Sequence, residues 1–201
     1  MKSLHRPDLY SWSVFDEPRN VDFHGLCWAR PEGNVLVDPL PMSAHDRQHL
    51  ADLGGAAHIV VTNSDHTRAA VELAAETGAV ICGPAAERDG FPIPCGRWLA
   101  DGDTVVPGLV ALALDGSKTK GELALLLDDS TLITGDLVRA HRAGSLMILP
   151  DAKLGDRAAA AASVRRLAAL PQVGAVLVGD GWPVFAGGRQ LLVELAERLG
   201  R

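Results

Sequence analysis

Short apolar segments separated by polar breaks run along the chain, and their lengths predict a mixture of strands and helices. In the first hundred residues, runs rich in aromatic and branched side chains predict short strands, with two helical segments among them. Ser43 provides an N-cap for one helix, and Gly78 ends the other. The predicted strands are 9–15, 25–30, 34–38, 58–62 and 79–82, and the predicted helices are 44–53 and 67–77.

The pattern then changes to consecutive strands, with Asp128-Asp129-Ser130 as a tight hairpin turn. An Ala-rich helix stopped by Pro171, a last strand and a last helix follow. The segment 139–153 is the longest without a regular pattern, which in a compact domain is typical of a functional loop. The predicted strands are 104–106, 109–114, 123–127, 131–134 and 175–178, and the predicted helices are 156–170 and 189–199.

This order of elements predicts an α+β fold, in which two mixed β-sheets pack face to face with helices on both outer faces. A length of 201 residues with 47% hydrophobic and 22% charged residues is typical of one globular domain, so we expect a single domain over 1–201.

Charge and composition limit the classes of molecule that the chain is expected to bind. The net charge is −6 and no basic stripe is present, which argues against nucleic acid and anionic membranes. The longest apolar run, 123–127, is too short to span a bilayer. The N-terminus lacks the apolar segment of a signal peptide, and the three cysteines have no paired spacing, so we expect a cytoplasmic location. Oligomer formation remains open.

Five segments in order resemble motifs of the metallo-β-lactamase superfamily, which includes the hydroxyacylglutathione hydrolases. They are NVLVDP (34–39), TNSDH (62–66), SKTKGELALLL (117–127), LITGD (132–136) and VGDG (178–181). They are similar, respectively, to a strand ending in a buried Asp, to THxHxDH, to GHTPGSxxL, to xxTGD and to GHG. The resemblance covers nearly the whole chain and implies an αββα sandwich and metal-dependent hydrolysis.

The resemblance also implies a two-metal site, from which this chain departs. The family's first metal takes two histidines from HxHxDH and one from GHTPG. Aligned without a gap, the first two histidine positions fall on Val61 and Asn63. With a two-residue deletion, the first histidine position falls on Asn63 instead. The third histidine position is Lys118. No imidazole ligand remains for the first metal, so we expect that metal to be absent.

The second metal's ligand positions, again as the resemblance implies, keep acidic or imidazole groups. They are Asp65, His66, Asp136 and Asp180, the last in place of a histidine. We expect one divalent ion there, with Mn²⁺, Fe²⁺ and Mg²⁺ suited to three carboxylates and one imidazole, and Zn²⁺ also allowed. Lys118 would replace the lost metal, pair with Asp136 and stabilise an oxyanion, so Lys118 and Asp136 are the candidate catalytic residues.

Two functions follow. The first is a metal-dependent hydrolase of a small ester, thioester, lactone or phosphoester, without β-lactamase activity because the three-histidine site is lost. The alternative is a non-catalytic binding or regulatory protein in which the same residues form a metal-free ion-pair cluster. In both, the expected partner is a small molecule, with an anion favoured by Arg139, His141 and Arg142 and contacted also by Asn63.

Overall fold

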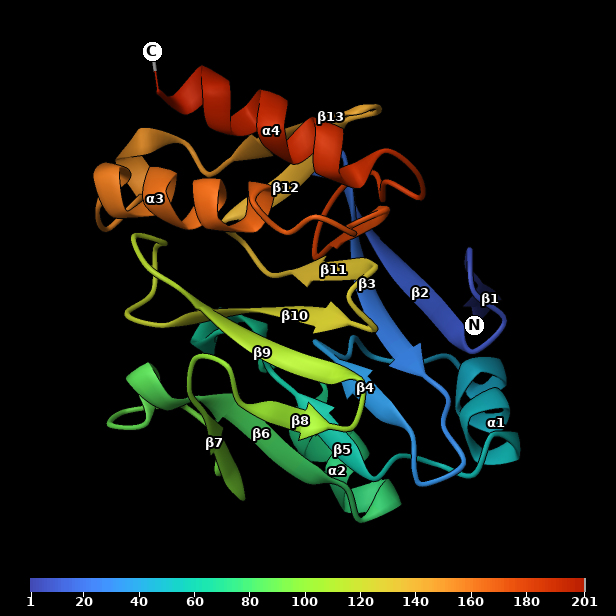
Figure 1. The fold of residues 1–201 in the computed structure, drawn as a ribbon. Coiled ribbons are helices and arrows are strands. Elements are labelled where there is room, and N and C mark those ends of the chain that lie inside the picture. The colour runs from blue at the N-terminus through green and yellow to red at the C-terminus, as the bar shows by residue number, and fades with distance from the viewer. Residues whose placement is uncertain (201) are drawn as a thin grey trace.

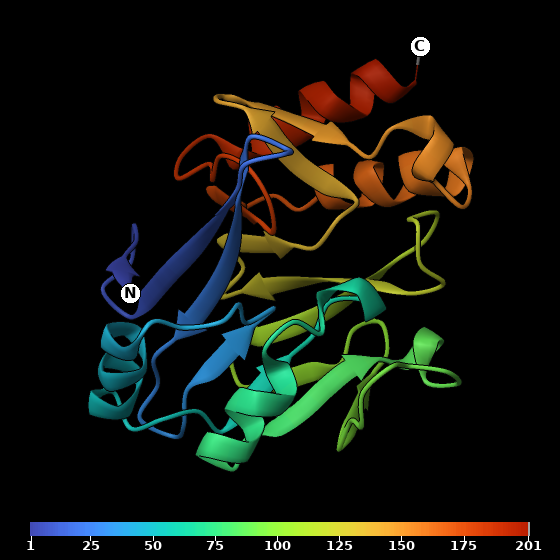
Figure 2. The ribbon, with the colours of Figure 1, turned by 180° about the vertical axis from the view of Figure 1, so that it is seen from behind.

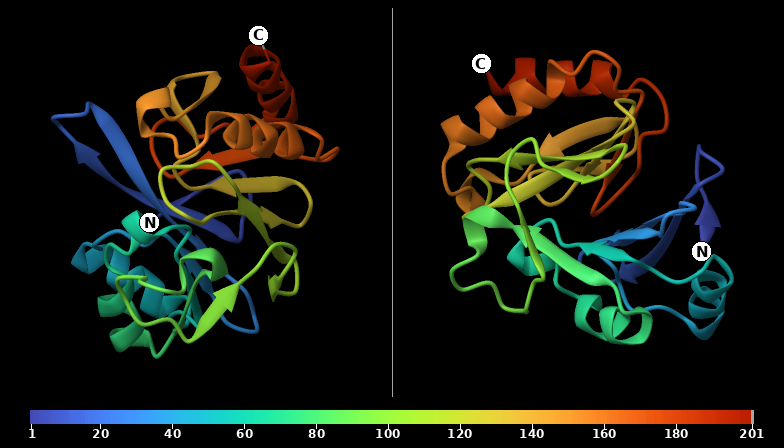
Figure 3. Two further views of the ribbon diagram at one scale, coloured as in Figure 1. Left: turned by 90° about the vertical axis from the view of Figure 1, so that its left-hand side faces the viewer. Right: turned by 60° about the horizontal axis from the view of Figure 1, so that its bottom comes forward.

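The computed structural model describes residues 1–200 and has four layers, with two β-sheets face to face and helices outside each (Figure 1). The αββα sandwich predicted from the sequence is confirmed. The same layers are visible from behind and from two further directions (Figures 2 and 3).

The first sheet has seven strands in chain order. It is antiparallel from β1 to β4 and parallel from β4 to β7. Its strands are β1 (Lys2–Ser3), β2 (Leu9–Asp16), β3 (Val21–Trp28), β4 (Val35–Val37), β5 (His58–Val60), β6 (Val80–Pro84) and β7 (Arg97–Leu99).

The second sheet has five strands in the order β14-β11-β10-β9-β8, and only β14 and β11 are parallel. Its strands are β8 (Thr104–Val106), β9 (Leu109–Leu114), β10 (Glu122–Leu127), β11 (Thr131–Thr134) and β14 (Ala175–Val178). Because both sheets contain parallel strands, several strands can place their carboxyl ends at one edge of the sandwich.

Alternating side chains of the strands fill the layers. In β10, Leu123, Leu125 and Leu127 join the core between the sheets, whereas Ala124 and Leu126 join the core beneath the outer helices. Both faces of this strand are apolar because both are covered. The helices α1 (Ala44–Asp52) and α2 (Ala70–Thr77) pack on the first sheet, and α3 (Arg157–Ala168) and α4 (Gly188–Leu199) pack on the second.

The segment 139–153 is not irregular, contrary to the prediction. It contains most of a hairpin of β12 (Val138–Arg142) and β13 (Ser145–Ile148), followed by the 3₁₀ turn η3 (Asp151–Lys153). The buried side chains of Val138, Ala140, Leu146 and Ile148 alternate with more exposed ones, which gives the hairpin one apolar face. A further short turn, η2 (Ala85–Glu87), follows β6.

The region around 62–70 also differs from the prediction in detail. The strand β5 ends at Val60, and the 3₁₀ turn η1 (Ser64–His66) precedes α2. Asn63 caps this turn, because its side-chain oxygen accepts a hydrogen bond from the Asp65 amide at 3.0 Å. Within residues 1–200, no helix combines the length and apolar character needed to cross a membrane.

Candidate functional site

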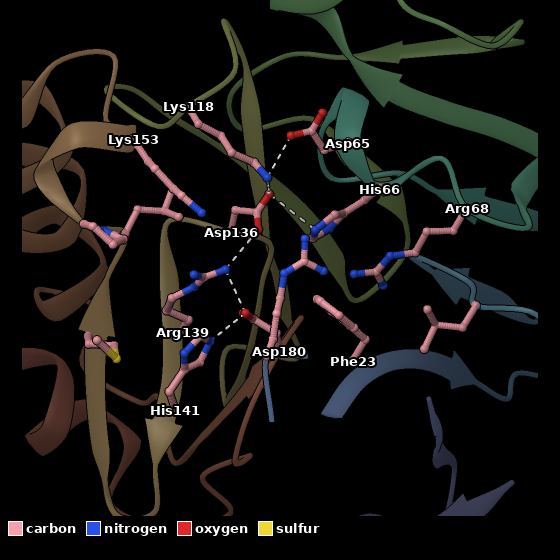
Figure 4. A pocket seen from close by; sticks show the side chains of 15 residues that line it. Phe23, Asp65, His66, Arg68, Lys118, Asp136, Arg139, His141, Lys153 and Asp180 are labelled. Carbon is pink, nitrogen blue, oxygen red and sulfur yellow. Dashed lines mark hydrogen bonds and ion pairs between the residues drawn. The ribbon is translucent and has the colours of Figure 1, made fainter. Parts of the chain in front are cut away.

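A pocket of about 680 Å³ opens at the edge of the sandwich where β4, β5, β11 and β14 end (Figure 4). The segments after these strands supply Asp38, His66, Asp136 and Asp180 respectively. The charged residues that line the pocket are Arg19, Asp65, His66, Arg68, Lys118, Asp136, Arg139, His141, Lys153 and Asp180. Five are Lys or Arg and three are Asp, so the pocket is basic although the whole chain is acidic.

His66 lies buried between two carboxylates. Its Nδ1 is 2.7 Å from Asp38 and its Nε2 is 3.3 Å from Asp136. Asp38 is fixed in turn by the amide and hydroxyl of Thr62, which donate to it at 2.8 and 2.6 Å. Burial alone would lower the pKa of His66, but the charge of Asp38 and the contact with Asp136 raise that pKa to about 9. The imidazole is therefore protonated at neutral pH and donates through both nitrogens.

Asp136 is a buried acceptor at the centre of the cluster. Lys118 Nζ lies 2.8 Å from Oδ2, and the Asn63 amide donates to the same oxygen at 3.3 Å. Burial would raise the pKa of Asp136, but His66 and Lys118 hold it well below the ordinary range. The carboxylate is ionised and saturated with donors.

Lys118 bridges two acids from different loops. Its ammonium lies 2.7 Å from Asp65 in addition to its contact with Asp136. Burial would lower the pKa of Lys118, but these two contacts raise it. The lysine is thus a fixed cation in the wall of the pocket, and a neutral nucleophilic amine is disfavoured.

Arg139 forms a second bridge. Its Nη2 lies 2.7 Å from Asp180 and 3.4 Å from Asp136 (Figure 4). His141, two residues further along β12, places Nε2 2.7 Å from the same Asp180 oxygen. The other oxygen of Asp180, Oδ1, is buried without a partner among the described residues.

Glu122 joins the two loops of the cluster from beneath. One of its oxygens accepts from Ser117 Oγ at 2.5 Å, next to Lys118, and the other accepts from the amide of Leu137 at 2.7 Å, next to Asp136. Burial raises the pKa of Glu122 to about 7, against the effect of the Ser117 hydrogen bond. One buried carboxyl group therefore holds both loops in place.

The structure brings together most of the residues predicted from the sequence. Asp65, His66, Lys118, Asp136, Arg139, His141 and Asp180 all line the pocket. Asn63 is buried behind them and contacts Asp136, whereas Val61 belongs to the core under α1 and α2. Arg142 is exposed and does not line the pocket, because it follows His141 near the turn of the hairpin. Whether these residues act on a ligand stays a prediction.

Several pocket residues were not predicted. Arg68 donates to the carbonyl oxygens of His24 and Asp38, and its guanidinium lies 5.5 Å from the centre of the Phe23 ring. Arg19 lies over the same ring at 5.7 Å, and Lys153 approaches from η3. Arg68 has a positive φ of 34°, which no sequence signal at this position indicates.

The fold and the position of the site together define the class of protein. The chain forms an αββα sandwich, and its polar cluster lies where parallel strands of both sheets end. The model of the metallo-beta-lactamase superfamily matches residues 1–199, and the chain belongs to this superfamily.

Solved structures of metallo-beta-lactamases share the fold. The DIM-1 enzyme has 15% identity and a TM-score of 0.74, covering 96% of this chain and 94% of that chain. The protein from Pontibacter korlensis has 18% identity and a TM-score of 0.73, with the same coverage. One from Erythrobacter litoralis, with beta mercaptoethanol in the active site, has 17% identity and a TM-score of 0.75, covering 98% and 95%. No curated protein sequence matches the chain.

Superfamily membership supports metal-dependent hydrolysis in general, which requires side chains arranged to hold a metal ion. Among residues 1–200, no group of three or more His, Cys, Asp or Glu side chains is arranged to hold one. Both nitrogens of His66 face carboxylates, and Asp65, Asp136 and Asp180 are each engaged by a cation. In this arrangement the four expected ligands do not fit a metal.

Proposed function

We propose that the chain binds a small organic anion in a metal-free form of the superfamily's active-site pocket. The observation that carries this proposal is the pair of bridges, Lys118 between Asp65 and Asp136 and Arg139 between Asp136 and Asp180. Protein cations thereby neutralise the acids that a metal would otherwise bind. The remaining cations of the pocket favour a negatively charged ligand.

Metal analysis tests the first half of this proposal. Untagged protein is loaded with Mn²⁺, Fe²⁺, Zn²⁺ or Mg²⁺, desalted and analysed for bound metal. We expect well below one equivalent, with no change in Asp180→Ala. One equivalent of metal that Asp180→Ala loses, and that the exposed control Arg142→Ala keeps, would contradict the metal-free site.

Anion binding tests the second half. Thermal unfolding is followed in EDTA at constant ionic strength with added carboxylates or phosphate. A ligand that binds only the folded state raises Tm progressively as its concentration exceeds Kd. At a hundredfold excess over Kd it adds roughly 2.7 kcal/mol to the free energy of unfolding. A panel of small carboxylates and phosphate that leaves Tm unchanged would contradict an anion site.

A metal-dependent hydrolase with one divalent ion on Asp65, His66, Asp136 and Asp180 is the second candidate. Superfamily membership and the partnerless Oδ1 of Asp180 favour it. It requires the side chains of Lys118 and Arg139 to leave their carboxylate partners. Hydrolysis of esters, thioesters, lactones and phosphoesters, measured with and without Mn²⁺, tests it, and metal-dependent turnover that Asp136→Asn abolishes would establish it.

A further inference from the structure

One wall of the pocket is apolar and partly uncovered. It consists of Phe23, Leu40, Met147, Leu149 and Pro150, beside the ion-pair cluster. Met147 is 40% exposed. When a ligand covers apolar surface in a pocket, the binding free energy becomes more favourable by about 25 cal/mol for each Å² removed from water. An inorganic anion has no apolar part, so this wall would stay in contact with water.

The β12–β13 hairpin fixes the apolar wall next to the charged floor. Arg139 and Met147 are directly opposite each other in the antiparallel ladder, and both line the pocket. Paired residues of a ladder extend from the same face of the hairpin, with Cβ atoms about 4.5–5.5 Å apart. A ligand that reaches the cationic floor therefore also contacts the methionine.

Two cations of the pocket have no carboxylate partner among the described residues. Arg68 donates to two carbonyl oxygens, and Lys153 forms no ion pair. Figure 4 shows their side chains on opposite sides of Asp136. Both retain donors for an anionic group of a ligand.

The other lysine and arginine side chains of the pocket are already paired. Lys118 contacts Asp65 and Asp136, Arg139 contacts Asp136 and Asp180, and Arg19 contacts Asp16 at 2.8 Å. Among the described residues, Arg68 and Lys153 are therefore the pocket cations that remain for the carboxylate of a ligand.

We infer that the ligand is an amphipathic carboxylate, whose carboxylate group contacts the cations and whose hydrocarbon body covers the wall around Met147. The inference rests on the proposed function and narrows its ligand class. A cavity of about 680 Å³ is ample for such a molecule, because pockets for small organic ligands span about 300–1,000 Å³.

Titrations with three probes test the inference. EDTA-treated protein is titrated with hexanoate, with hexanamide as the uncharged counterpart and with inorganic phosphate, at constant ionic strength. We expect saturable binding of hexanoate, and binding at least about tenfold weaker for hexanamide and for phosphate. Binding is measured by calorimetry and by chemical-shift changes of the Met147 methyl group.

Matched variants separate the two contributions. Met147→Gln and Lys153→Gln should each weaken hexanoate binding by roughly threefold or more. The exposed residues Val71 and Arg189 lie outside the pocket, so Val71→Gln and Arg189→Gln should leave binding unchanged. If phosphate binds as tightly as hexanoate and Met147→Gln has no effect, the inference fails while the anion site stands. If none of the anions binds, both fail.

Discussion

Lys118 Nζ lies 2.8 Å from the carboxylate of Asp136. Lys118 stands where the motif resemblance predicts a metal-binding histidine. The contact joins the loop before β10 to the loop after β11, and Asp65 extends it to the loop after β5. An ammonium group thus connects three loops at this edge of the sandwich. The stability of the cluster should therefore depend on charge pairing within the protein.

Removing the lysine should destabilise the fold. Lys118→Met leaves Asp136 buried with less compensation, and we expect a loss of about 2–4 kcal/mol in the free energy of unfolding. The control is Asp65→Asn, because Asp65 is about half exposed and its pair with Lys118 should contribute less than about 1 kcal/mol. Urea denaturation measures both. Equal effects of the two substitutions would show that Asp136 does not depend on Lys118.

His66 should titrate far from its ordinary range. Its pKa is raised to about 9, so its stabilising effect is complete below the unfolded pKa near 6.5 and is lost as pH rises through about 9. Asp38→Asn removes the main attraction and should lower the pKa of His66 by about one unit or more. NMR titration of the imidazole signals measures this, with exposed His45 as the internal reference. An unchanged His66 midpoint would contradict the role of Asp38.

Glu122 should make stability fall as pH rises. Its folded pKa of about 7 lies above the ordinary 4.5, so the folded state binds more protons than the unfolded state between these values. Glu122→Gln removes this dependence and keeps an oxygen acceptor for the Leu137 amide. We expect the stability of the variant relative to the wild type to increase by about 1–3 kcal/mol between pH 5 and pH 8.

Urea denaturation at the two pH values measures the Glu122 effect. Glu32→Gln is the matched control, because Glu32 is largely exposed. A stability difference that is the same at both pH values for Glu122→Gln would rule out the proposed titration.

Gly25 should not tolerate a side chain. A Cβ at this position would lie 2.6 Å from the ring of Trp12, whose indole donates to the carbonyl of Leu40 in the pocket wall. We expect Gly25→Ala to cost about 1–3 kcal/mol by overpacking. Gly174→Ala is the control, since the nearest atom there is 3.8 Å away and φ is not positive. Thermal unfolding compares the two, and equal Tm values would contradict the close packing.

Much of the fold could be predicted from the sequence because its patterns are local. The apolar run 123–127, the turn at Asp128-Asp129-Ser130 and the stop at Pro171 correspond to observed elements. The β12–β13 hairpin was missed although Val138, Ala140, Leu146 and Ile148 alternate with polar or exposed residues. The strands are short and β12 contains several polar residues, so this alternation is weak in the sequence.

The candidate site was predictable as a set of residues but not as a set of contacts. Motif positions identified Asp65, His66, Asp136 and Asp180 as neighbours of one pocket. Which cation each acid pairs with depends on side-chain reach across loops far apart in sequence. The sequence places Arg139 in the same predicted loop as exposed Arg142, whereas the structure pairs Arg139 with Asp180 at the pocket floor.

The segment 179–182 carries Asp180 and is hydrogen bonded on two sides. On one side it is bonded to β3, where the His24 amide donates to the Gly179 carbonyl and the Asp22 carbonyl accepts from the Gly181 amide. On the other side the Trp182 amide donates to the carbonyl of Ala140 on β12 at 2.7 Å. The floor of the pocket is therefore mechanically continuous with the hairpin that forms its wall. Lifting this hairpin would therefore break backbone hydrogen bonds and displace the segment that carries Asp180 at the same time.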